Sequence, residues 1–142
     1  MDIFNIEVEL ADTEARRRTG LMYRASLSDN KGMFFIFNEL GDHTFWNKNV
    51  NFPIDIGFFN EDGELLNIRS AEKDCTLPVK SGFNNIKYVL EVNKDFFKKN
   101  DISLGDRIID LKNIDKKKEK TSHYYNNIVK DENYYILSLE KI

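Results

Sequence analysis

Short segments in which apolar and polar residues alternate recur along the chain. Residues 3–10 form the clearest one, with a period of two that is typical of a half-buried strand. The continuous apolar run at residues 33–37 fits a strand buried on both faces. The same signals predict further strands at residues 44–46, 54–59, 64–69, 86–92, 107–111 and 133–139.

Turn and cap signals separate these segments. Residues 60–63, which read Asn-Glu-Asp-Gly, predict a hairpin between two strands. Asp12 can cap a short helix over residues 13–18, and Asn93 can cap a second one over residues 94–99. Residues 70–85 have no regular pattern and predict an irregular connection.

Several short strands joined by turns predict a mainly β fold. We expect a single-domain sandwich or barrel over residues 1–142, with one or two short helices. A length of 142 residues suits one domain. Past residue 111 the composition shifts to a basic run at residues 116–120, which predicts a solvated loop. The final strand at 133–139 is expected to pair with an otherwise open sheet edge.

Charge and composition exclude several classes of function. The chain has 24 acidic and 21 basic residues and a formal net charge of −3, which argues against general binding to nucleic acid. Its single cysteine excludes an internal disulfide framework. Residues 1–10 lack the basic start and apolar run of a signal peptide, and no window resembles a membrane span. We expect a cytoplasmic protein, or an exported one if a segment before Met1 has been trimmed away.

Several motifs follow one another in a recognisable order. They are Arg17-Arg18-Thr19-Gly20-Leu21-Met22-Tyr23-Arg24, Gly32-Met33-Phe34-Phe35-Ile36-Phe37, Phe45-Trp46-Asn47-Lys48-Asn49-Val50, Pro53-Ile54-Asp55, Asp62-Gly63, Val89-Leu90-Glu91 and Gly105-Asp106. This ordered set resembles the DUF192 (UPF0127) family of uncharacterised bacterial and archaeal proteins over residues 8–109. The family pattern reads R-x-x-G-L-M-x-R, G-M-x-F-x-F, F-W-M-K-N-T and P-L-D.

The resemblance implies a compact, mainly β domain of jelly-roll-like type. It implies no reaction, because no activity is established for the family, and many relatives look exported. Asn47 stands where the pattern has methionine and Val50 where it has threonine, so no role is carried over to these two side chains. Residues 113–142 lie outside the family core and form a C-terminal extension to which nothing is carried over.

One stretch of the sequence suggests a ligand-binding rim. Trp46 can act as a stacking platform, Lys48 and Asn49 as hydrogen-bond donors, and Asp55 as an acceptor. An aromatic residue with polar groups at strand ends can hold a sugar or a small anion. The partner expected is therefore a small polar or sugar-like ligand, and no protein partner can be named.

The same residues also have a purely structural interpretation. Trp46 would then pack in the core. Asp55 would form an ion pair with a buried arginine, because a buried charge persists only with a partner. We hypothesise that Arg17 or Arg24 pairs with Asp55, since a guanidinium can donate two bonds to one carboxylate. The candidate ligand-binding set is thus Arg17, Arg24, Trp46, Lys48, Asn49 and Asp55.

Other chemistry is weakly signalled, and we predict no catalytic residue, metal site or cofactor. His43 and His123 are far apart in the sequence, and Asp42-His43 reads as an ordinary loop. Cys75 lies in no recognised nucleophile motif. The arginines at 16–18 cannot all face one phosphate, because successive residues of a helix point in different directions.

Three functions are ranked on this basis. The first is a small non-catalytic ligand-binding or accessory module, which predicts a concave polar pocket near Trp46. The second is a protein-interaction or structural domain, which predicts a buried Trp46 and an exposed apolar patch over Tyr124, Tyr125 and the Tyr134-Tyr135 pair. The third is a hydrolase, which needs an acid–base pair or a metal in one cleft.

Overall fold

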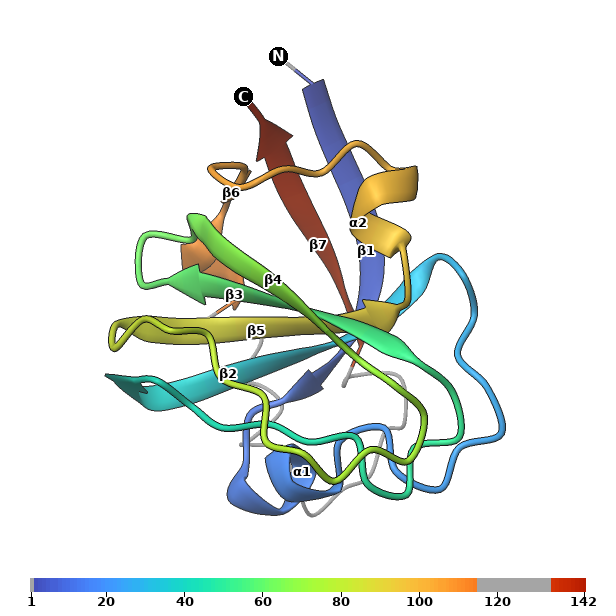
Figure 1. Ribbon diagram of the computed structural model, residues 1–142. Helices are drawn as coiled ribbons and strands as arrows, with labels where there is room; N and C mark the ends of the chain where they lie inside the picture. Colours follow the sequence, from blue (N-terminus) through green and yellow to red (C-terminus); the bar gives the residue numbers. More distant parts are fainter. Residues whose placement is uncertain (1, 115–133) are drawn as a thin grey trace, which may run out of the picture.

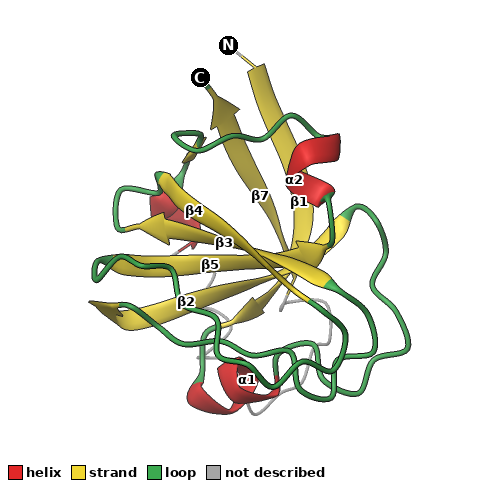
Figure 2. Cartoon of the chain, in the orientation of Figure 1, coloured by secondary structure: helices red, strands yellow, loops and turns green. Residues whose placement is uncertain are grey.

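The computed structural model describes residues 2–114 and 134–142, and in these residues the strands form one seven-stranded sheet. Across the sheet the strands run in the order β4-β3-β5-β2-β1-β7-β6 (Figure 1). The bounds are β1 (Asp2–Ala11), β2 (Lys31–Gly41), β3 (Ile54–Asn60), β4 (Leu65–Ala71), β5 (Ile86–Asn93), β6 (Arg107–Ile108) and β7 (Tyr134–Lys141). The helices α1 (Glu14–Thr19) and α2 (Phe96–Lys99) lie well apart, with α1 among loops at one end (Figure 2).

Neighbouring strands are antiparallel except for β1 and β2, which run parallel. The outer strands β4 and β6 approach each other through an isolated bridge between Glu64 and Arg107. The sheet is nevertheless not closed into a barrel. The mainly β class is therefore confirmed, the barrel alternative is wrong, and the jelly-roll-like arrangement stays a prediction.

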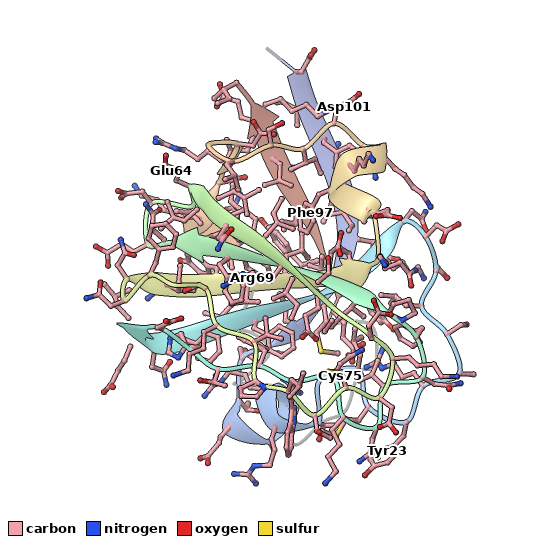
Figure 3. The ribbon with its side chains drawn as sticks, in the orientation of Figure 1. Tyr23, Glu64, Arg69, Cys75, Phe97 and Asp101 are labelled. Carbon is pink, nitrogen blue, oxygen red and sulfur yellow. The ribbon has the colours of Figure 1, made fainter. Side chains whose placement is uncertain are left out.

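The two faces of the sheet carry two separate apolar clusters. The α2-side core lies on the face covered by α2, and it includes Phe34, Leu90 and Phe97. Phe97, labelled in Figure 3, packs so closely on β3 that a Cβ atom at Gly57 would lie 2.6 Å from its ring. A glycine is therefore required at this point of β3 by the contact itself.

The α1-side core lies on the opposite face, where the loops around α1 cover the sheet. It includes Leu21, which follows α1, and Phe35, Ile56 and Val89 from β2, β3 and β5. Because side chains alternate along a strand, β5 sends Leu90 to one core and both Val89 and Glu91 toward the other. A strand with both faces covered is buried throughout, whatever the polarity of its residues.

Most predicted strands are confirmed, with small changes at their ends. Residues 44–46 do not form a strand but contribute one isolated bridge between Phe45 and Val79. The strand predicted at 107–111 ends at Ile108, and residues 111–114 are helical. The predicted final strand is β7, and it pairs antiparallel with β1, leaving β6 beyond it as the edge.

Both predicted helix caps are wrong by one or two residues. Thr13, not Asp12, caps α1 by accepting a hydrogen bond from the Arg16 backbone N–H. Asp12 instead pairs with the Arg16 side chain at 2.9 Å. α2 begins only after Asp95. The Asn93 side chain donates to the Leu27 carbonyl and so ties β5 to the loop before β2.

Candidate functional site

A pocket lies where α1 and the loop at residues 44–50 meet the α1-side face of the sheet. Its volume of about 300 Å³ falls at the lower end of the range for small-ligand sites. One wall is α1 with the turn after it, and the opposite wall is the segment from Thr44 to Val50. Phe35 and Phe37 of β2 and Glu91 of β5 complete the lining.

Trp46 and Lys48 form one side of this pocket. The Trp46 side chain is 48% exposed, so it is not a core residue, which contradicts the structural interpretation of this tryptophan. The Lys48 ammonium lies 5.2 Å from the centre of the indole ring, a cation–π arrangement. Trp46 also borders a second hollow together with Thr76 and Pro78.

The three consecutive arginines of α1 point in three directions, as their helical positions require. Arg16 pairs with Asp12, and Arg18 pairs with Glu14 at 2.8 Å. Arg17 lines the pocket, donates to the Ile36 carbonyl at 2.8 Å, and has its guanidinium 5.3 Å from the Phe37 ring centre. The β2 strand thus positions this cation at the edge of the pocket.

Glu91 lies at the floor of the pocket within the α1-side core. Its side chain is only 4% exposed, and its strand neighbours across the sheet are Met33 and Ile56. In the described part of the chain no hydrogen bond or ion pair reaches its carboxyl group. Burial raises the pKa of Glu91 to about 8, so the group is mainly protonated at neutral pH.

Gly20 brings α1 close to this carboxyl group. It ends the helix with a φ of +49°, a conformation that a glycine adopts at little cost. A Cβ atom here would lie 3.5 Å from the Phe35 ring and 3.8 Å from Glu91 Oε1. The absence of a side chain therefore leaves the floor of the pocket open beside the acid.

Arg24 and Asn49 lie outside this pocket. Arg24 forms an ion pair with Glu9 at 2.7 Å and lines a separate hollow on the other side of Gly20. Asn49 has a φ of +60°, and its amide donates to the Tyr23 hydroxyl. Its backbone N–H is held by Asp74. Asn49 thus fixes the loop that carries Lys48.

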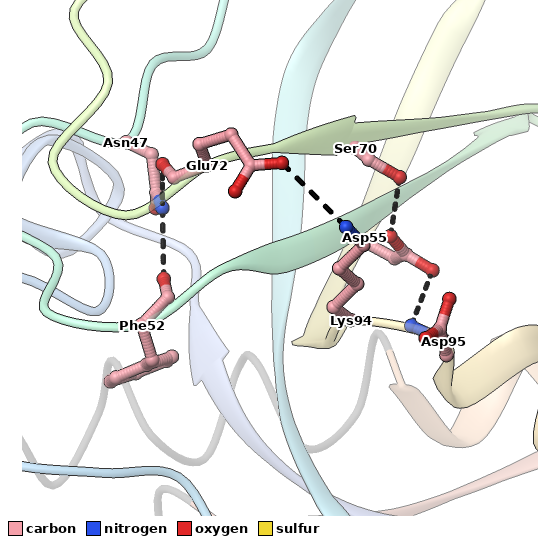
Figure 4. Close-up of polar contacts among 7 residues, drawn as sticks. All are labelled: Asn47, Phe52, Asp55, Ser70, Glu72, Lys94 and Asp95. Atoms are coloured by element: carbon pink, nitrogen blue, oxygen red, sulfur yellow. Dashed lines mark hydrogen bonds and ion pairs between the residues drawn. The ribbon is translucent and has the colours of Figure 1, made fainter.

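Asp55 is a structural residue with partners other than arginine, so the Arg17 or Arg24 pairing hypothesis is wrong. Its carboxylate accepts a hydrogen bond from the Ser70 hydroxyl at 2.6 Å and one from the Asp95 backbone N–H at 2.9 Å (Figure 4). Asp55 therefore links β3 to β4 and to the start of α2. It does not line the pocket.

Asn47 holds the loop between Trp46 and Lys48 in place. It is fully buried, and its amide donates to the carbonyls of Phe52 and Glu72 (Figure 4). Two bonds to separate loops fix the backbone between the two pocket residues. The sequence resemblance assigned this residue no role, because it replaces a methionine of the family pattern.

The remaining candidates are spread over the loops. The His43 ring stacks on Phe37 at 3.6 Å, and Asp42 holds the backbone N–H and hydroxyl of Ser81. That Ser81 contact lowers the pKa of Asp42. Cys75 is partly buried in the loop region of Figure 3 where Tyr23 also lies.

Within the described residues no group of three or more histidine, cysteine or acidic side chains is placed to hold a metal ion. No helix in this part of the chain has the length and apolar character needed to cross a membrane. His123, Tyr124, Tyr125 and the basic run at 116–120 lie outside the described residues.

Sequence reasoning missed Glu91 as a site residue. Side chains alternate along the predicted strand at 86–92, so Glu91 shares a face with Lys87. A lysine on that face indicates that the face is exposed to solvent. The signal that could have found it lies in the neighbouring strands, because residues 33–37 are apolar on both faces and Asp55 is the one charged residue within 54–59. A strand between two such strands is covered on both sides, and any acid in its middle is buried.

The fold and the pocket define a mainly β protein with a cavity closed by a short helix on one face of its sheet. The chain belongs to the DUF192 family, whose model, described as "Uncharacterized ACR", matches residues 2–109. No curated protein matches the chain.

Two solved structures resemble this one. A protein of unknown function from Novosphingobium aromaticivorans is 35% identical, with a TM-score of 0.66, over 70% of this chain and 71% of that one. A Sinorhizobium meliloti protein described as a "putative transcription regulator" is 30% identical, with a TM-score of 0.68. That match covers 75% of this chain and 94% of the other.

Proposed function

We propose that this protein binds a small polar ligand in the pocket between α1 and the loop at residues 44–50, as a non-catalytic binding or accessory module. The observation that carries the proposal is the Glu91 carboxyl group, which lies buried on the pocket floor without a protein partner among the described residues. The Glu91 oxygens face the pocket and are not sealed in the core, since the fully buried polar atoms without a partner among the described residues are Asp12 Oδ2 and Asn47 Oδ1. A ligand that bonds to Glu91 therefore takes the place of water at this group.

The pocket walls support the same proposal. Trp46 offers an exposed aromatic face, and Lys48 and Arg17 offer cationic donors at its edge. Small-molecule sites combine an apolar lining with a few convergent polar groups in this way. Three of the six residues selected from the sequence, Arg17, Trp46 and Lys48, contribute to this lining.

A protein-interaction function has less support. It required a buried Trp46, whereas the indole is half-exposed. Of the tyrosines expected to form its apolar patch, Tyr134 is exposed beside Ile136 on the outer face of β7. Asn5 and Ser138, which bond to each other, separate this pair from Ile3 on β1, and Tyr124 and Tyr125 lie outside the described residues. The exposed apolar area in the described residues is therefore small.

The test uses Trp46, the only tryptophan of the chain, as reporter. Its emission is followed while glucose, glucuronate, benzoate, inorganic phosphate, ethanolamine and glycine are added in turn. We expect a saturable change with at least one compound, which Arg17→Ala weakens at least tenfold.

Arg69→Ala is the matched control for Arg17→Ala. Arg69 is an exposed arginine that also donates to a backbone carbonyl, that of Lys80, but it lies outside the pocket. The control should bind like the wild type. Emission that none of the compounds changes, or a change that Arg17→Ala leaves intact, would contradict the proposal.

A further inference from the structure

The protonation state of the pocket floor limits what the pocket can accept. The Glu91 side chain is surrounded by the α1-side core and Gly20, and no cation among the described residues reaches it. Without a counter-charge a buried carboxyl group stays neutral rather than ionised. A neutral carboxyl group carries one O–H donor, so the floor offers a proton to an acceptor atom of the ligand.

The walls have the opposite charge to the protein as a whole. The chain has a formal net charge of −3, yet three cationic side chains, Arg17, Arg18 and Lys48, line the pocket. The other acid in the lining is Glu14, and it already pairs with Arg18. No carboxylate in the described residues forms an ion pair with Arg17 or Lys48.

These two features discriminate among ligand charges. A cationic ligand would need Glu91 ionised in an apolar setting and would face the repulsion of Arg17 and Lys48. A neutral polyol could bond to Glu91 but would supply no negative charge to Arg17 and Lys48. A small anion satisfies both requirements, because one of its oxygens accepts a hydrogen bond from the Glu91 O–H while its negative charge faces the two cations.

Resting on the proposed function, we infer that the pocket is a proton-linked site for a small organic anion, with the protonated Glu91 carboxyl as the donor that contacts it. Arg17 and Lys48 supply the complementary charge, and Trp46 packs on the organic part. When Glu91 loses its proton, the donor is lost and a negative charge appears on the pocket floor. Binding of the anion therefore weakens as the pH rises.

Glu91 sets the pH range of this effect. The other ionisable groups facing the pocket are Glu14, Arg17, Arg18 and Lys48. The strands that flank Glu91 present Met33 and Ile56, which do not titrate. Between about pH 6 and pH 9.5 the change of binding is thus assigned to Glu91, whose pKa is raised to about 8.

The test compares D-glucuronate with D-glucose, which have nearly the same size and differ in one negative charge. Benzoate and benzyl alcohol serve as a second such pair. Binding is measured by calorimetry and Trp46 emission at pH 6.5 and at about pH 9.5. We expect at least one anion to bind tenfold or more tightly than its neutral partner at pH 6.5. Its affinity should fall at least tenfold at pH 9.5, because only the protonated fraction of the protein binds it.

Glu91→Gln separates the proton linkage from a general effect of pH. The amide keeps a donor and cannot ionise, so this variant should bind the anion equally well at both pH values. Lys48→Ala should weaken binding of the anion but not of the neutral compound paired with it. Lys87→Ala is the matched control for Lys48→Ala. Lys87 also lies over an aromatic ring, that of Tyr88, away from the pocket.

The outcomes distinguish the two proposals. Neutral compounds that bind as well as their anions, or a loss of affinity at pH 9.5 that persists in Glu91→Gln, would overturn the inference and leave the binding function intact. Failure of both members of both pairs to bind at pH 6.5 would overturn the anion site. If every compound of the wider set also fails, the proposed function falls with it.

Discussion

Leu90 and Glu91 are adjacent residues of β5 that face opposite sides of the same sheet. Leu90 is fully buried among the apolar and aromatic side chains of the α2-side core. Glu91 is almost as deeply buried in the α1-side core, but it ends in a carboxyl group at the floor of a pocket. One core is closed by α2, whereas the other is left open beside Gly20.

This difference separates the two tasks of the fold. The α2-side core supplies stability through complete apolar burial, which is worth about 25 cal/mol for each Å² removed from water. The α1-side face gives up part of that gain to hold an acid and a cavity. Residues that reduce stability without an evident compensation are typical of functional sites.

The largest effect is expected from Leu90→Ala. Removing a fully buried leucine side chain from a closed core costs about 2–5 kcal/mol, through lost transfer energy and the cavity left behind. Urea unfolding followed by circular dichroism measures the change. The cost should be the same at pH 5 and pH 9, since no carboxyl or amine side chain belongs to that cluster among the described residues. A cost below 1 kcal/mol would remove the basis of the comparison.

Glu91→Gln, unlike Leu90→Ala, should increase the free energy of unfolding at neutral and alkaline pH. The pKa of Glu91 is raised from 4.5 to about 8 in the folded protein, so between these values the folded state holds a proton that the unfolded state has lost. Wild-type stability should therefore fall as the pH rises through this window, by about 1.4 kcal/mol for each pH unit at most, and level off above it.

The variant lacks this contribution. Glu91→Gln should therefore be less sensitive to pH between about 5 and 8 and more stable than the wild type at pH 8. Denaturant unfolding of both proteins at pH 5, 6.5, 8 and 9 provides the measurement. Parallel stability curves for the two proteins would show that Glu91 is already ionised in the folded state.

Asp55→Ala tests a polar link that belongs to the frame and not to the pocket. The substitution leaves the Ser70 hydroxyl and the Asp95 backbone N–H without their shared acceptor. We expect a loss of about 1–3 kcal/mol of stability and unchanged binding of any pocket ligand. Unfolding and Trp46 titrations on the same samples check both parts. Loss of binding in a folded Asp55→Ala protein would reinstate Asp55 as a site residue.

Trp46→Ala should have the smallest effect on stability. The indole is half-exposed, and its contact with Lys48 is worth about 0.5–1 kcal/mol at an exposed position. Ligand affinity, measured by calorimetry because the reporter is lost, should fall at least tenfold. A variant that unfolds easily would show that Trp46 is part of the core after all.

The strands could be predicted from the sequence because their signals are local. Alternation and apolar runs placed β1 to β5 and β7 within a few residues. The cap of α1 was misplaced because Asp12 and Thr13 are both good caps, and only the ion pair with Arg16 decides between them.

The site could be predicted only in part, because it is assembled from distant segments. Arg17 and Arg24 belong to the same sequence motif, yet the turn at Gly20 sends them to different hollows. One of the two partners of Asp55 is a backbone amide 40 residues away, which no pattern of side chains reveals. Glu91 gains its character from strands on either side of β5, not from its own neighbours in sequence.

The ionisation of Glu91 is the most direct test of this account. The side-chain carboxyl carbon can be followed by ¹³C NMR from pH 3 to pH 10 and assigned by its absence in Glu91→Gln. A midpoint near 8 would establish a neutral acid on the pocket floor at physiological pH. A midpoint near the ordinary glutamate value of about 4.3 would mean that the floor is anionic. The proton-linked anion site would then be contradicted.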